Sequence, residues 1–154
     1  MKHYFIAALL TLSATAQAEN IKLDKVLSVS DYLYTMRDKP AVTIVLGGTE
    51  INFVRITMLR QDIKQGTKAE SSNEIPFSIS ATWNSQMFMY ENGYKFKSTY
   101  SVEISKLDIK NKQAIIKLDF CLQNTTRTDY ICTTGSDIIV SGKYFYNLTD
   151  TPKQ

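Results

Sequence analysis

The two cysteines, Cys121 and Cys132, are the residues whose chemistry the sequence constrains most closely. They flank the polar segment Gln123–Thr128, which separates two strand-like runs. If they face each other across this turn, a cross-strand disulfide closes a loop of about a dozen residues and contributes about 3 kcal/mol. The alternatives are a reactive dithiol or half of a metal site, but the ten-residue gap is not a C-x-x-C motif. We therefore expect a structural disulfide.

The segment Met1–Ala18 is typical of a secretory signal peptide. Lys2 supplies the positive charge, Tyr4–Leu12 is the apolar region, and Ala16–Ala18 is an A-x-A cleavage site. The apolar region is too short to cross a bilayer, which takes about 20 residues. We predict a single periplasmic or secreted domain over residues 19–154, in an oxidising compartment that favours the disulfide.

Removal of the predicted signal peptide also excludes most types of catalytic site. The chain has a single histidine, His3, so the mature protein lacks histidine-dependent triads and histidine metal sites. The formal net charge falls from +3 to +2 with Lys2, which gives no argument for nucleic-acid binding. The acidic residues that could act in pairs are scattered: Glu50, Asp62, Glu70, Glu91, Asp108, Asp119 and Asp137. We predict no catalytic, cofactor-binding or metal-ligating residues and no enzymatic activity, although a Ser–Lys pair stays open.

Alternating apolar and polar residues predict about eight strands. The clearest is Ala114–Leu122, which places Ile116, Leu118, Phe120 and Leu122 on one face and Cys121 on the other. The further runs are Ala41–Leu46, Ile51–Leu59, Ile75–Trp83, Met87–Glu91, Tyr94–Tyr100, Val102–Ile109, Tyr130–Thr134 and Ser136–Tyr146. Short turns join them, so we predict an all-β, mainly antiparallel, single-domain β-sandwich or small barrel.

Three segments lie outside this pattern. Asn20–Lys39 favours a short helix or an irregular N-terminal arm, in which Ser30 and Asp31 would cap a helix over Tyr32–Arg37; a strand over Ile21–Val29 is the alternative. Arg60–Glu74 is polar and aperiodic, which predicts an exposed loop, and Asn147–Gln154 predicts a frayed tail.

Two surfaces are candidates for partner binding. The Asn92–Gly93 turn signal predicts a hairpin that gathers aromatic and lysine side chains on one face, and the polar loop adds three more cations. The blander interpretation is a set of cross-strand aromatic residues covered by lysine stems, beside a solvated loop. The residues concerned are Phe88, Tyr90, Lys95 and Lys97 in the hairpin, and Arg60, Lys64 and Lys68 in the loop.

Three functions fit these predictions. The first is a non-enzymatic binding or assembly protein, accessory to an envelope machine such as pilus biogenesis or secretion, which acts through contacts with another exported protein. The second is an immunity or inhibitor protein that blocks a toxin or hydrolase. The third is a small-ligand carrier with a lumen lined by Trp83, Tyr94, Phe96 and Tyr100.

Overall fold

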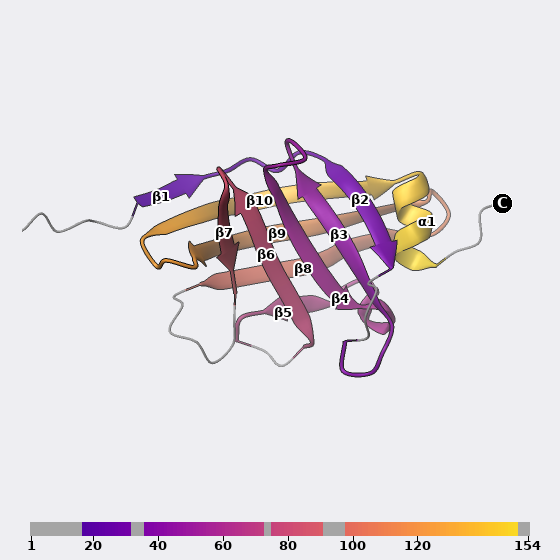
Figure 1. Ribbon diagram of the computed structural model, residues 1–154. Coiled ribbons are helices and arrows are strands. Elements are labelled where there is room, and N and C mark those ends of the chain that lie inside the picture. Colours follow the sequence, from indigo (N-terminus) through magenta and orange to yellow (C-terminus); the bar gives the residue numbers. More distant parts are fainter. Residues whose placement is uncertain (1–16, 32–35, 73–74, 91–97, 151–154) are drawn as a thin grey trace, which may run out of the picture.

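The computed structural model describes residues 17–31, 36–72, 75–90 and 98–150. These residues form ten strands, one 3₁₀ turn and one helix (Figure 1). The elements are β1 (Gln17–Asn20), β2 (Val26–Asp31), β3 (Ala41–Gly47), β4 (Phe53–Leu59), η1 (Arg60–Asp62), β5 (Lys68–Glu70), β6 (Phe77–Trp83), β7 (Gln86–Met89), β8 (Thr99–Asp108), β9 (Gln113–Asn124), β10 (Asp129–Ser141) and α1 (Lys143–Thr149). The all-β prediction is confirmed, with more strands than the eight expected.

The strands form a single sheet that folds over on itself into two layers. One layer runs β2-β3-β4-β6-β7, and the other runs β5-β8-β9-β10-β1. All pairs are antiparallel except β1 with β10. Figure 1 shows β2, β3, β4 and β6 crossing in front of β8, β9 and β10.

The two layers join along one edge of the long strand β9. This edge pairs with β8 as far as Cys121, and with β7 at Gln123 and Asn124. Between the two partners, the Ser98 hydroxyl accepts a hydrogen bond from Gln123 N and donates one to Met89 O, at 2.9 and 2.8 Å. The hydroxyl thus satisfies backbone groups at the corner where β7 gives way to β8.

The core lies between the layers and is aliphatic. As predicted, Ile116, Leu118, Phe120 and Leu122 of β9 are all buried. Ile44, Ile56 and Ile79 of the facing layer are also buried, none more than 1% exposed. The predicted hairpins β3–β4 and β8–β9 have the expected strands, so period-two alternation located the core correctly in these segments.

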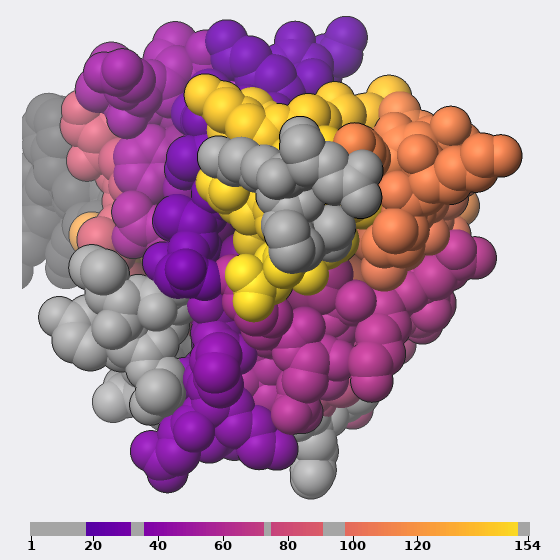
Figure 2. Space-filling view, turned by 90° about the vertical axis from the view of Figure 1, so that its right-hand side faces the viewer, coloured from indigo at the N-terminus to yellow at the C-terminus, as the bar shows by residue number. Residues whose placement is uncertain are grey.

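The C-terminal segment differs from its prediction. The expected last strand over Ser136–Tyr146 stops at Ser141, and α1 replaces both its end and the start of the expected frayed tail. Phe145 and Leu148 are fully buried, so the helix closes one end of the sandwich (Figure 2). Burial of this apolar pair outweighs the strand propensity of the aromatic residues around it.

Two further expectations are corrected. In the N-terminal segment, β2 over Val26–Asp31 partly matches the alternative strand, since Val29 is buried and the strand pairs with β3. Ser30 and Asp31 belong to this strand rather than to a helix cap, and residues 32–35 of the expected helix lie outside the described residues. The segment Arg60–Glu74 is not a simple loop, because it contains η1 and β5. Ala69 of β5 is fully buried against β8.

Candidate functional site

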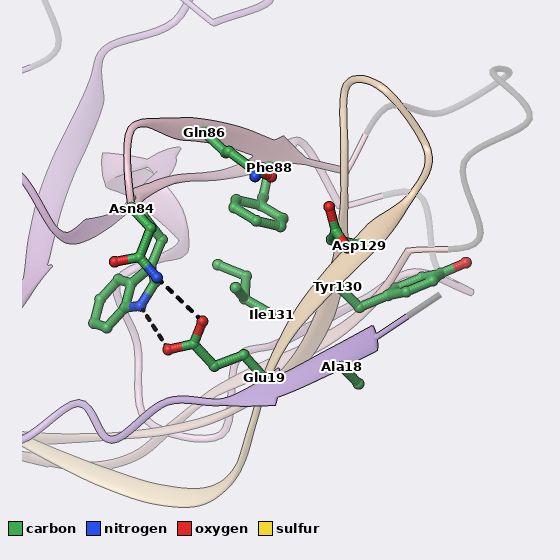
Figure 3. Close-up of a pocket in the computed structure, with 9 residues that line it drawn as sticks. Ala18, Glu19, Asn84, Gln86, Phe88, Asp129, Tyr130 and Ile131 are labelled. Atoms are coloured by element: carbon green, nitrogen blue, oxygen red, sulfur yellow. Dashed lines mark hydrogen bonds between the residues drawn. The ribbon is translucent and has the colours of Figure 1, made fainter. Parts of the chain in front are cut away.

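A cavity of about 420 Å³ lies beside β1, where β6 ends and where β7 and β10 begin. Figure 3 shows Glu19 pointing from β1 toward Asn84, while Tyr130 points away from this pair. The cavity is lined by aromatic, amide and carboxylate side chains from four strands and one turn: Ala18, Glu19, Trp83, Asn84, Gln86, Phe88, Asp129, Tyr130 and Ile131.

Glu19 connects the N-terminal strand to the opposite layer. Its carboxylate accepts hydrogen bonds from Trp83 Nε1 at 3.2 Å and from Asn84 Nδ2 at 3.3 Å (Figure 3). Asn84 lies in the tight turn between β6 and β7, where its φ of 48° is left-handed. Asparagine tolerates this conformation better than most residues, and the turn positions its amide over the cavity.

The turn between β9 and β10 is held by a buried amide. Asn124 is 2% exposed, and its Nδ2 donates to Gln86 Oε1, Thr128 Oγ1 and Asp129 Oδ2 at 2.9, 3.1 and 3.1 Å. Its Oδ1 accepts hydrogen bonds from the backbone N–H groups of Thr128 and Asp129. This network fixes the start of β10, which forms one wall of the cavity.

The predicted disulfide is confirmed. Cys121 and Cys132 are directly paired across β9 and β10, and both are half-buried. On the neighbouring strands, Cys121 is paired with Thr99 of β8 and Cys132 is paired with Asn20 of β1. A disulfide-bonded β domain is compatible with export, because such bonds persist in oxidising compartments.

Strand β1 has cavities on several sides. Besides the cavity at Glu19, one of about 510 Å³ adjoins Asn20 and the disulfide, and one of about 480 Å³ adjoins residues 20–24. The side chains of Ala18, Glu19 and Asn20 are exposed. Strand β1 is therefore seated less densely than the strands that contribute to the core.

The predicted aromatic surface is not present as such on the described residues. Phe88 is 4% exposed, so it belongs to the core and the cavity wall rather than to an open face. Tyr90 is half-buried, and its hydroxyl donates to Ser71 O at 3.2 Å. Phe88 faces inward in β7, which pairs with β6 on one side and with β9 at Asn124 on the other; residues 91–97, which include the expected hairpin partners, lie outside the described residues. Lys95 and Lys97 lie outside the described residues.

The three predicted loop cations have different roles. Arg60 forms an ion pair with Asp31 and donates to the α1 carbonyls of Asn147 and Leu148 at 3.1 and 3.2 Å. It therefore holds the helix in place rather than facing a partner. Lys68 is exposed and paired with Glu70 of the same strand. The Lys64 side chain is exposed.

Of the residues predicted to line a ligand lumen, Tyr100 packs against other aromatic side chains of the protein. The Tyr100 ring stacks on the Phe77 ring with 4.7 Å between the ring centroids, and it meets the Tyr90 ring edge-on with 4.6 Å between the centroids. Burial, with a smaller contribution from Tyr90, raises the pKa of Tyr100 to about 12. Trp83 lines the cavity near β1 instead, while Tyr94 and Phe96 lie outside the described residues.

Sequence reasoning overlooked the residues that build the cavity at β1. Glu19 was placed at the predicted cleavage point, and Asn84 and Gln86 were assigned no role. The pair Asn84–Ser85 directly after a strand was the available signal, since Asn and Ser are common in turns.

Within the part of the chain that the structure describes, no group of three acidic or cysteine side chains could hold a metal ion. No helix there is long and apolar enough to cross a membrane. Comparison of the chain with protein-family models, with curated proteins and with solved structures finds no match.

Proposed function

We propose that the protein is an exported, non-enzymatic binding protein that acts through contacts with another protein of the cell envelope. It is accessory to an assembly such as a pilus or a secretion machine. The open end of the sheet at β1 and β10 is the contact surface. The observation that carries the proposal is the unequal protection of the sheet's ends.

The β2 end of the sheet is covered by α1. Tyr144 Oη donates to Leu27 O at 2.9 Å, and Asn147 Nδ2 donates to Val29 O at 2.8 Å. These bonds occupy carbonyl groups that an added strand would need. A second strand cannot approach β2 without displacing the helix.

The β5 end is short and charged. It has three residues, with Lys68 and Glu70 on either side of the buried Ala69. Short strands that carry charged residues are a common protection against unwanted strand pairing.

Among the described residues, no helix covers the β1 end, which is a strand of four residues (Figure 1). Strand β1 is itself an added strand, since it is the one described strand that pairs in parallel, and it joins β10 from outside the antiparallel meander. The edge of β10 thus accepts an extended segment, which is how many domains bind peptides. Adjacent cavities leave room for the side chains of such a segment.

Photo-crosslinking in cells tests this proposal. A photoreactive phenylalanine analogue at Tyr130 occupies the start of β10, and the same analogue at Ile109, which is 54% exposed, serves as the control. We expect one discrete protein adduct from position 130 in the periplasmic fraction and none from position 109. An adduct with a single hydrolase would support the inhibitor function instead. Absence of any protein adduct, or equal adducts from both positions, would contradict binding at this end of the sheet.

A further inference from the structure

The predicted cleavage point lies within a strand of the structure. Gln17 and Ala18 pair with Asp129 and Tyr130 of β10, and Glu19 pairs with Ile131. If the leader is removed after Ala18, as the proposed export requires, the first half of β1 is lost. The start of β10 then loses its neighbour on this side.

The N–H of Tyr130 faces this vacated position. Gln123, its partner on β9, donates its N–H to Ser98 Oγ and thus away from β10, so Gln123 and Tyr130 form a non-hydrogen-bonded pair. Two residues along, Cys132 likewise directs its carbonyl to β1, where Ile21 N donates at 2.8 Å. Because this orientation repeats every second residue, the N–H and C=O of Tyr130 also point toward β1. In the same register, Glu19 N faces the Tyr130 carbonyl and the Gln17 carbonyl faces the Tyr130 N–H, so cleavage uncovers the N–H while Glu19 stays beside the carbonyl.

Cleavage also places a positive charge at one end of the vacated position. The new α-amino group of Glu19 is mostly protonated at neutral pH, since such groups have a pKa of about 7.7–8.0. The Glu19 carboxylate stays tied to Trp83 and Asn84, so the first residue is held at a fixed place. A chain that takes the place of Gln17 and Ala18 must end where Glu19 begins.

We propose that the vacated position binds the carboxyl-terminal end of a partner polypeptide. The last two residues of the partner add in parallel to β10 beside Tyr130, and the terminal carboxylate meets the Glu19 ammonium group. Charge complementarity favours a free carboxylate over an internal segment, which would have to turn away from Glu19. This inference rests on the proposed export and cleavage, and it specifies the kind of partner segment.

The geometry also assigns a side to the partner's penultimate residue. Side chains alternate along a strand, so this residue projects on the same side as Glu19, toward the cavity lined by Gln86, Phe88 and Asp129. The cavity of about 420 Å³ has room for such a side chain. The last residue projects to the opposite side, as Ala18 does.

A peptide titration of the mature protein tests the inference. The probe is a synthetic hexapeptide with the sequence of Ser13–Ala18 and a free carboxylate, and its C-terminal amide is the control. Trp83 is the single tryptophan and lines the site, so its fluorescence reports binding. We expect the amide to bind at least tenfold more weakly than the acid, and the affinity of the acid to fall as the pH rises past 8.

A chain that retains Gln17 and Ala18 is the matched control protein, because these residues fill the position themselves. We expect it not to respond to the peptide. Equal binding of acid and amide, or no binding of either by the chain that begins at Glu19, would overturn the inference. The intact mass of the exported protein distinguishes failure of the proposed processing from failure of this inference. A first residue other than Glu19 contradicts the processing. A chain that begins at Glu19 but does not bind the peptide contradicts this inference alone.

Discussion

Replacement of Arg60 by alanine should destabilise the fold by about 2–3 kcal/mol. The guanidinium donates two hydrogen bonds to carbonyls in α1, and its side chain is only 19% exposed. Hydrogen bonds that involve a charged group contribute about 1.5–3 kcal/mol, whereas an exposed ion pair contributes about 0–1 kcal/mol. Asp31, the ion-pair partner, is 82% exposed, so most of the loss should come from the helix carbonyls.

Urea unfolding of the mature protein, followed by Trp83 fluorescence and circular dichroism, measures this loss. Asp31→Ala is the control for the ion pair and should cost at most about 1 kcal/mol. Lys64→Ala, at an exposed position, should change the free energy of unfolding by less than about 0.5 kcal/mol. If Arg60→Ala costs no more than Lys64→Ala, or if Asp31→Ala costs as much as Arg60→Ala, the assigned role of Arg60 in holding α1 is wrong.

Three further predictions concern the disulfide, a buried tyrosine and the reversed face of β7. Replacing Cys121 and Cys132 together by serine should lower the free energy of unfolding in urea by about 3 kcal/mol, because the bridge closes a short loop in the unfolded chain; an unchanged midpoint would contradict this. The raised pKa of Tyr100 means that the unfolded chain loses this proton first, so stability should fall between pH 10 and 12 by up to about 3 kcal/mol. Urea midpoints across this range should fall less steeply in Tyr100→Phe, and an identical fall in both proteins would refute the assignment. Phe88→Ala should lower the free energy of unfolding by about 3–5 kcal/mol, and Met87→Ala, at a 53% exposed residue, by less than about 0.5 kcal/mol. A larger loss for Met87→Ala than for Phe88→Ala would support the orientation of β7 expected from the sequence.

Strand periodicity predicted the part of the fold in which local pattern and long-range pairing agree. Along β9, apolar residues at every second position face the other layer, and Cys121 lies opposite Cys132 as the intervening turn predicts. The alternation alone determines which face is buried in such a strand, so no knowledge of its neighbours was needed.

The face of β7 could not be predicted in the same way. Phe88 was assigned by the register of an expected hairpin with the following strand, but β7 pairs with β6 and reaches β9 at Asn124. A strand of four residues has too little pattern of its own to decide its orientation. The corner of the sheet decides it, and that contact joins residues far apart in the sequence.

Long-range contacts also explain the two misassigned ends of the chain. The sequence Lys143–Thr149 contains three adjacent aromatic residues that favour a strand, yet it forms a helix because Phe145 and Leu148 fill the end of the sandwich. Residues 17–20 were divided between a leader and an irregular arm. The open edge of β10, which the sequence does not reveal, explains why they form a strand.

The most direct test of the account is the photo-crosslink from position 130, compared between two chains. One chain is processed after Ala18, and the other retains Gln17 and Ala18 on β10. The account predicts a discrete partner adduct for the processed chain and its loss when the two residues remain. Equal adducts from both chains would show that the partner does not bind at the vacated start of β10.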